Sequence, residues 1–221
     1  MMNKFYSVLI TMCFIGTGVQ AQSDQSHVKG YTASVFIGVN HVEPYSFTSK
    51  MLYPGEKGKS HFKNGTFLQV QLGKEMGKIW ALELELERQS NDEDYSELAG
   101  RIIKKDGYWS ATSSLLSLEV YPWEVYGIKP FFGIGTGVSF AKVKESVPNT
   151  AYYIDDSSSE ILLQLSLGIG KKVSRNTSLK VKYEYNDDGH VHLENTNSVQ
   201  PRAFINHVFA VGVTYHFSSS R

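Results

Sequence analysis

Cysteine, net charge and long apolar runs are all scarce in this 221-residue chain. Its single cysteine, Cys13, lies inside an N-terminal apolar segment, where the preceding Met12 and the short stretch upstream do not suit lipidation. The rest of the chain has no thiol, which excludes a disulfide, an iron–sulfur cluster and a cysteine nucleophile. The 22 basic residues balance the 22 acidic ones, whereas a nucleic-acid-binding domain usually has a basic excess. We therefore expect no nucleic-acid partner.

The N-terminus has the pattern of a secretory signal. Lys4 supplies a positive charge, residues 5–19 are mostly apolar and uncharged, and Val19-Gln20-Ala21 ends in a small residue, as at a cleavage site. This run is short for a membrane-spanning helix, and no later segment approaches 18 consecutive apolar residues. We expect a signal peptide over residues 1–21, followed by a short periplasmic segment over residues 22–29.

Beyond residue 29 the apolar residues recur at every second position, which is the period of a β-strand. The clearest run sets Trp80, Leu82, Leu84 and Leu86 on one face and Ala81, Glu83, Glu85 and Glu87 on the other. We predict eight such strands, near residues 31–40, 68–73, 80–87, 116–121, 132–140, 161–170, 179–185 and 209–217. Their number is even, as in bacterial outer-membrane barrels.

The connections alternate between long and short. The long polar ones are residues 42–63, 88–107, 142–158 and 186–204, and the short ones are 75–78, 122–127 and 171–177. A soluble β-sandwich also alternates along its strands, but this order is typical of extracellular loops and periplasmic turns. The pattern predicts an all-β fold, an eight-stranded antiparallel up-and-down transmembrane β-barrel over residues 30–217, with a tail at 218–221. Both termini should be periplasmic and the long loops extracellular.

Aromatic residues stand where the membrane interfaces are expected, because such rings favour the level of the lipid headgroups. Those near the periplasmic ends are Tyr31, Trp80, Trp123, Phe132, Tyr215 and Phe217; those near the loops are Trp109, Phe140, Tyr183, Tyr185 and Phe209. This arrangement favours a barrel placed in a bilayer.

Three stretches resemble known small outer-membrane barrels: Lys129-Pro-Phe-Phe-Gly-Ile-Gly-Thr-Gly-Val138, Leu163-Gln-Leu-Ser-Leu-Gly-Ile-Gly170 and Val211-Gly-Val-Thr-Tyr-His-Phe217. The similar families are the transmembrane domain of outer-membrane protein A, the opacity proteins and the Ail-type adhesins. The resemblance implies a bacterial outer-membrane location, with lipid and lipopolysaccharide around the barrel. It also implies a terminal signal, Gly212, Tyr215 and Phe217, read by the barrel-assembly machinery. Ala210 departs from the pattern, and so does the tail after the phenylalanine.

Charged residues lie on the face of the strands that should line the lumen. They are Glu83, Glu85, Glu119, Lys180, Lys182 and Glu184. An eight-stranded barrel has an interior just wide enough for side chains to fill, and unpaired buried charge is costly. We expect these groups to pair across the barrel, with Lys182 level with Glu83, and to close it to diffusion. The alternative is a wetter lumen that passes small solutes.

The first long loop carries the residues that we expect to meet a ligand. Lys57, Lys59, His61 and Lys63 lie among aromatic residues there, and such a mixture suits an anionic polysaccharide or a host surface. A solvated loop without a ligand is the alternative. We favour a non-enzymatic outer-membrane surface protein acting in adhesion, because the loops of such proteins usually carry the function.

The sequence patterns for an enzyme site or a metal site are incomplete. A lipid A-modifying hydrolase of similar size would need a His-x-Ser pair, but Phe209 follows His207 at the required spacing. His190 and His192, near Asp187, Asp188 and Glu194, have types that bind zinc, in a segment expected to be a solvated loop. The glycines of residues 133–137 lack the third glycine of a dinucleotide loop. We expect no catalytic residue, no cofactor and no metal.

Cleavage after Ala21 predicts a mature chain that begins at Gln22 and fractionates with outer membranes, because the signal is removed during export. N-terminal mass spectrometry of the purified protein should find Gln22 at or within a few residues of the start. Recovery as a soluble periplasmic protein would contradict the barrel.

Overall fold

The computed structural model describes residues 30–48, 55–103, 106–146, 153–190 and 203–217. The expected signal peptide, the segment 22–29 and the tail 218–221 lie outside these residues. The strands are β1 (Tyr31–Val42), β2 (Tyr45–Thr48), β3 (Lys57–Phe62), β4 (Gly65–Glu75), β5 (Trp80–Leu98), β6 (Arg101–Ile103), β7 (Asp106–Val120), β8 (Ile128–Ser146), β9 (Tyr153–Lys172), β10 (Thr177–His190) and β11 (Ala203–Phe217). The described residues contain no helix long and apolar enough to cross a membrane.

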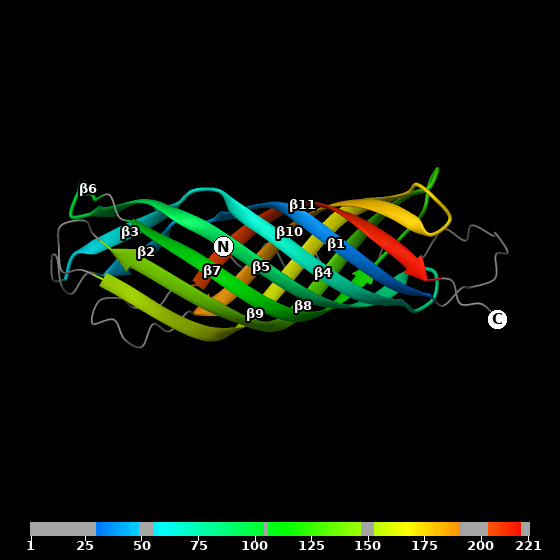
Figure 1. Ribbon diagram of the computed structural model, residues 1–221, viewed down its shortest axis with the longest axis horizontal. Helices are drawn as coiled ribbons and strands as arrows, with labels where there is room; N and C mark the ends of the chain where they lie inside the picture. The colour runs from blue at the N-terminus through cyan, green and yellow to red at the C-terminus, as the bar shows by residue number, and fades with distance from the viewer. Residues whose placement is uncertain (1–29, 49–54, 104–105, 147–152, 191–202, 218–221) are drawn as a thin grey trace.

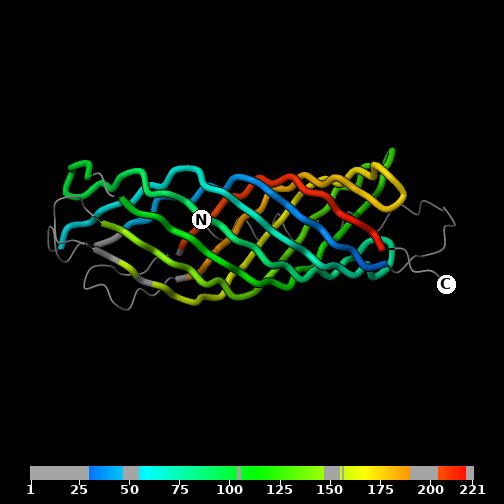
Figure 2. Tube along the Cα trace, in the orientation of Figure 1, coloured from blue at the N-terminus to red at the C-terminus, as the bar shows by residue number. Residues whose placement is uncertain are grey.

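Eight strands pair antiparallel in a closed ring, in the order β1, β4, β5, β7, β8, β9, β10, β11 (Figure 1). The last strand closes the ring on the first, from Tyr31 opposite Phe217 to Val42 opposite Asn206, and the two run side by side in Figure 2. Because the ring is closed, each of these strands has a neighbour on both sides, and the backbone groups along the wall pair between strands. The predicted eight-stranded barrel is confirmed.

The two ends of the barrel differ, and we call them the turn end and the loop end. The turn end carries Tyr31, Phe217 and the short connections. In one of these connections Val125 and Ile128 form an isolated β-bridge. At the loop end β2 and β3 pair as a hairpin, β3 adds to the upper part of β5, and β6 pairs with β5 (Figure 1). The sheet therefore continues beyond the ring at this end.

The long connections are shorter than predicted. Strand β5 runs to Leu98 and β8 to Ser146, both well inside segments expected to be loops. The inward positions there are polar, with Gln89, Asn91 and Glu93 buried. The alternation of apolar and polar residues is therefore lost in this part of the sequence, although the strand continues. A β-strand turns successive side chains to opposite faces whatever their polarity.

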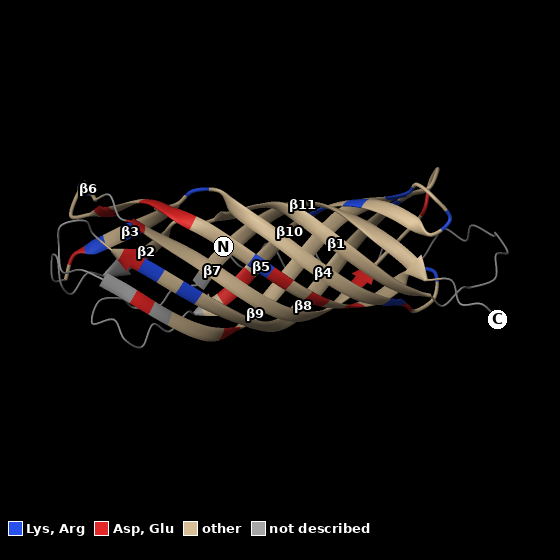
Figure 3. Ribbon diagram, viewed as in Figure 1, with Lys and Arg blue, Asp and Glu red and all other residues tan. Residues whose placement is uncertain are grey.

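The outside of the ring is apolar. Valine and leucine side chains of β1, β4 and β5 face outward, with exposed fractions of 50% for Val35, 44% for Val70 and 49% for Leu84. Further outward residues are Ile37, Leu68, Leu86, Ile134, Val138, Ile161, Leu163, Leu167, Val181, Phe209, Val211 and Val213. This belt suits the hydrocarbon of a bilayer. Charged positions gather beyond it at the loop end (Figure 3).

An apolar cluster closes the interior at the loop end. It comprises Val42, Tyr45, Phe62, Leu98, Trp109, Ala111, Val143 and Phe204. Trp109 stacks on Phe204 with ring centroids 5.9 Å apart and is fully buried. The placement of Trp109 in the outer aromatic girdle is therefore wrong, because its position on β7 turns the indole inward. We call this cluster the apolar cap.

Gly212 provides space for Phe36 inside the wall. The two residues are cross-strand partners on β11 and β1. A Cβ atom on Gly212 would clash with the Phe36 ring, whereas one on Gly170 would have its nearest neighbour at 3.5 Å. A residue expected to serve an assembly signal thus also has a packing role.

Gly212→Ala should lower the free energy of unfolding by about 1–3 kcal/mol, the usual cost of overpacking. Gly170→Ala, an inward glycine with room for a methyl group, is the matched control. The measurement is urea unfolding of the protein in detergent. A double variant with Phe36→Leu should recover much of the loss. Equal stability of both glycine variants would contradict this packing role.

Candidate functional site

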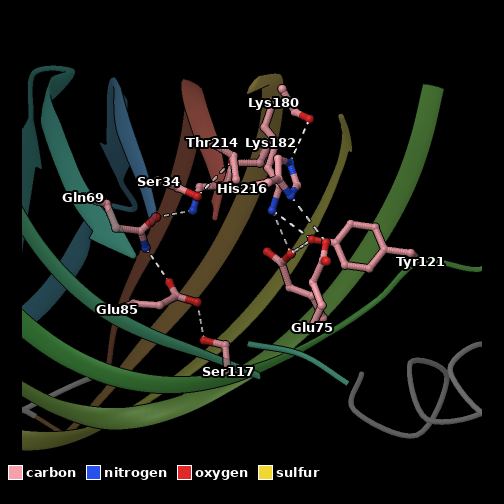
Figure 4. A network of polar contacts seen from close by, with 12 residues as sticks. Ser34, Gln69, Glu75, Glu85, Ser117, Tyr121, Lys180, Lys182, Thr214 and His216 are labelled. Atoms are coloured by element: carbon pink, nitrogen blue, oxygen red, sulfur yellow. Dashed lines mark hydrogen bonds and ion pairs between the residues drawn. The ribbon is translucent and has the colours of Figure 1, made fainter. Parts of the chain in front are cut away.

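The lumen contains the charged residues expected from the sequence, and they form two networks. In the first, Lys182 of β10 forms an ion pair with Glu184 at 2.5 Å and donates a hydrogen bond to the Gln69 amide oxygen on β4. Gln69 in turn donates to Glu85 at 2.5 Å, and Ser117 donates to the same carboxylate (Figure 4). The network thus joins β10, β4, β5 and β7 across the interior.

The second network lies nearer the turn end. Lys180 forms an ion pair with Glu119 at 2.9 Å and a hydrogen bond with the Tyr121 hydroxyl at 2.9 Å. Tyr121 also donates to Glu119, and the Lys180 ammonium lies 4.9 Å from the centre of the Phe131 ring. Lys180 and Glu119 are both buried, so each charge is neutralised by the other residue rather than by water.

The expected pairing of Lys182 with Glu83 is wrong. Gln69 and Glu184 take the Lys182 ammonium, which also lies 4.0 Å from the Phe36 ring centre. Glu83 is buried, and its Oε2 has no hydrogen-bond partner among the described residues. Equal distances from the strand ends do not place two residues at the same depth, because the strands of a closed barrel are staggered relative to one another.

Carboxyl groups dominate the buried part of the interior. Eight acidic residues are buried in the described chain, against the two lysines: Glu83, Glu85, Glu87, Glu93, Glu119, Glu145, Glu184 and Asp188. Several of these, with Gln69, Gln89 and Asn91, were not identified from the sequence, although their inward positions follow from alternation along β4 and β5. Among the described residues the buried interior is therefore richer in carboxyl groups than in ammonium groups.

Between these networks and the apolar cap lies a layer of amides and one carboxylate. Asn40 donates to Gln89 at 3.1 Å and to Asn91 at 2.5 Å. On β11, the strand that pairs with β1, the Asn206 amide donates to Asp188 at 2.8 Å. We call Asp188, Asn186 and Asn206 the upper polar cluster.

The outward positions around the upper polar cluster are mixed, because Asp187 and His207 are polar whereas Ile205 and Leu163, which lie opposite Asp187 on the two neighbouring strands, are apolar. The Asp188 carboxylate accepts hydrogen bonds from Asn206 and Ser139.

Polar groups also meet at the top of the barrel. Tyr45 of β2 donates a hydrogen bond to Glu145 of β8, and Ser96 donates to Glu93 at 2.8 Å. Burial raises the pKa of the Tyr45 hydroxyl well above its usual value, and the negative charges of Glu145 and Glu93 add to the rise. The phenol is therefore a hydrogen-bond donor at physiological pH, and it ties the first loop to β8.

At the turn end the lumen opens into a pocket of about 260 Å³. Its lining includes Lys129 and Arg175 near the mouth and ends at Glu83 and Lys180. His216 lies 3.5 Å from Glu75 there (Figure 4). Burial opposes ionisation of Glu75, but the hydrogen bond and charge of His216 lower its pKa overall. The lining of this pocket does not include Lys182 or any residue of the apolar cap.

The first long connection, residues 42–63, is called loop 1 below. Four of its basic residues lie in a row. Lys57, Lys59 and His61 lie at alternate positions of β3, and Lys63 follows; the three lysines are exposed. The ladder β2–β3–β5 holds this row, with His61 stacked on Tyr95 at 4.4 Å between ring centroids. Glu97 lies opposite Lys59 and 3.7 Å from His61, so one carboxylate offsets part of the charge.

On the outer wall, His207 belongs to a hydrogen-bonded chain. Its Nδ1 lies 2.7 Å from the Tyr183 hydroxyl and its Nε2 lies 3.0 Å from Glu43. Phe209, the next outward residue of β11, is apolar and exposed. This hydrogen-bonded chain orients the His207 imidazole as in a catalytic base. The hydroxyl at its end, however, is the Tyr183 phenol rather than the serine that a His-x-Ser enzyme would use.

The remaining expected residues are placed as follows. Tyr215 and Phe217 face outward at the turn end, with exposed fractions of 45% and 49%. His192 and Glu194 lie outside the described residues. Within the described chain no group of three or more histidine, cysteine, aspartate or glutamate residues is arranged to hold a metal.

Comparison with known proteins agrees with this geometry. The family model of the outer membrane protein beta-barrel domain matches residues 9–217. The chain belongs to this outer-membrane β-barrel family. No curated protein sequence matches it.

Solved structures share the fold at low sequence identity. The outer membrane protein OprG of Pseudomonas aeruginosa is 14% identical with a TM-score of 0.57, covering 89% of this chain and 100% of that one. The outer membrane protease OmpT of Escherichia coli is 9% identical with a TM-score of 0.53 and the same coverage. Ail of Yersinia pestis, solved with the heparin analogue sucrose octasulfate, is 16% identical with a TM-score of 0.46 and covers 86% of this chain and 99% of that one.

Replacing Lys182 should lower the free energy of unfolding, because the buried carboxylate beside it loses its positive partner. Lys182→Leu leaves Glu184 without its ion pair, and breaking a buried pair costs about 3 kcal/mol. Urea unfolding in detergent should show this loss, and Lys171→Leu, at an exposed position of the wall, should show almost none. In planar bilayers the wild-type protein should give little steady conductance. Large conductance together with an unaffected Lys182→Leu stability would instead favour a small-solute pore.

Proposed function

We propose that this outer-membrane barrel is a non-enzymatic surface protein, and that its first loop binds an anionic polysaccharide on an opposing surface. The observation that carries the proposal is the row of Lys57, Lys59 and Lys63 on the β2–β3 hairpin and directly after it. Three exposed ammonium groups on one ordered edge offer regularly spaced contacts to sulfate or carboxylate groups. Pre-ordering by the ladder reduces the entropy lost on binding.

The proposed orientation puts both termini in the periplasm and the loop end outside the cell. It is supported by the asymmetry of the barrel, because short turns face the periplasm and longer connections face outward in outer-membrane barrels. In this orientation the apolar belt contacts outer-membrane lipid and lipopolysaccharide, and Gly212, Tyr215 and Phe217 belong to a segment read by the barrel-assembly machinery. The β3 row then stands clear of the bilayer.

A closed interior supports an anchoring role over a pore. The apolar cap and two charge networks fill the lumen above the turn-end pocket. An anchor needs only the stable wall, so the function is expected in the loops.

The triple variant Lys57→Gln, Lys59→Gln, Lys63→Gln should bind heparin at least about tenfold more weakly than the wild type, because three charge contacts are removed. Binding should also weaken as salt rises, since exposed charges are screened within about 8 Å at physiological ionic strength. Surface plasmon resonance on immobilised heparin measures both effects.

The matched control carries Lys171→Gln, Lys172→Gln and Arg175→Gln at the turn end, removing the same charge from the other mouth of the barrel. It should bind like the wild type. Unchanged binding by the first variant would remove loop 1 from consideration. Deacylated lipid A in cells that express the protein, lost in His207→Ala, would favour the hydrolase instead.

A further inference from the structure

The upper polar cluster contains buried polar atoms that no described neighbour satisfies. Asp188, Asn186 and Asn206 are each at most 1% exposed. Asp188 Oδ1, Asn206 Oδ1 and both polar atoms of the Asn186 amide have no hydrogen-bond partner among the described residues. Leaving buried polar atoms without a hydrogen-bond partner is costly, so these atoms are available to bind a further group.

Strand pairing brings these side chains together. Asn186 of β10 lies opposite Asn206 of β11, and Asn206 donates to the Asp188 Oδ2 at 2.8 Å. The register of the two strands shifts between Asp187 and His190, and Gly189 takes a φ of +65° there. Asp188 is two residues beyond Asn186 on β10, so it faces the lumen by the ordinary alternation of a strand, and the β-bulge ends the regular pairing just there.

The cluster is enclosed. Phe204, the next inward residue of β11, belongs to the apolar cap and stacks against Trp109. Toward the turn end lies Glu184, which is fully buried and keeps an unpartnered Oε2 beside its pair with Lys182, as far as the described residues go. A guest in the cluster would therefore exchange slowly with solvent and would meet oxygen atoms on several sides.

We propose that the upper polar cluster is an internal binding site for a hard divalent cation of the Ca²⁺ type. The available ligands are the Asp188 carboxylate and the amide oxygens of Asn186 and Asn206, with Glu184 on the turn-end side. Carboxylate and amide oxygens are what Ca²⁺ takes, in a flexible geometry with six to eight ligands. Neither sulfur nor imidazole is needed, which disfavours zinc and copper.

Charge argues in the same direction. Eight buried carboxyl groups face two buried ammonium groups in the described chain, so a divalent cation reduces the excess where a water molecule does not.

The described neighbours of Asp188 leave it without a basic partner. Ser139 of β8 and Asn206 of β11 contribute neutral hydrogen bonds, and Lys182 is held by Glu184 and Gln69. A cation would therefore be the positive partner of the Asp188 carboxylate.

Terbium luminescence tests the proposal, because Tb³⁺ replaces Ca²⁺ and is excited through a nearby indole. The protein is refolded into detergent with Tb³⁺ present, so that the enclosed site can load. We expect saturable emission that Ca²⁺ displaces, and loss of most of it in Trp109→Phe, since the other tryptophans that the structure describes, Trp80 and Trp123, are exposed at the turn end. Heat-modifiable gel mobility verifies folding of each variant.

Asp188→Asn should weaken binding at least about tenfold, because it removes the charged ligand. Asp187→Asn, its partly exposed neighbour on the same strand, should bind like the wild type. Asn186→Asp gives a second, independent readout, because it adds a carboxylate to the cluster at almost unchanged volume. It should destabilise the protein in chelator and be restored by Ca²⁺, with a larger Ca²⁺-dependent rise in melting temperature than the wild type shows. This readout holds even if Asp188→Asn fails to fold.

Two results would overturn the proposal. One is emission that is absent, or that persists unchanged in Asp188→Asn and Trp109→Phe, which would place any bound ion on surface carboxylates. The other is an Asn186→Asp protein that Ca²⁺ does not stabilise, which would mean that the cluster holds only water.

Discussion

Closure of the ring between β1 and β11 is the constraint on which the rest of this structure depends. A backbone in hydrocarbon must satisfy its hydrogen bonds internally, and a closed antiparallel sheet does so without leaving an edge. Once the wall is closed, every strand presents one row of side chains to lipid and one to a narrow interior. The apolar belt and the buried charges are two consequences of the same alternation.

The interior is organised in layers because its contents have to satisfy one another. Lys180 with Glu119 and Lys182 with Glu184 and Gln69 form the charged layers. The amides and Asp188 lie above them, and aromatic side chains cap the whole. Such filling follows from the narrow interior of an eight-stranded barrel, in which inward side chains contact one another across the lumen.

The loop end is an extension of the wall rather than a set of free connections. The ladder from β2 through β3 to β5, and the hydrogen bond from Tyr45 to Glu145 of β8, attach the first loop to two strands of the ring that are separated by β7. The lysines of β3 therefore occupy ordered positions. A surface that is ordered before it meets a ligand loses less entropy on binding, and this gives the proposed polysaccharide contact its physical basis.

The sequence alone determined the strand number, their order and the outward belt, because period-two alternation and connection length are local properties of the chain. The inward placement of Glu83, Lys180 and Lys182 followed from the same alternation. Only the tertiary structure decided that Trp109 points inward, that Lys182 meets Gln69 and Glu184 rather than Glu83, and that Asp188 joins Asn206. These contacts depend on how the strands pair and on the stagger between them. The stagger arises when strands pair around the whole ring, so it cannot be inferred from a local sequence pattern.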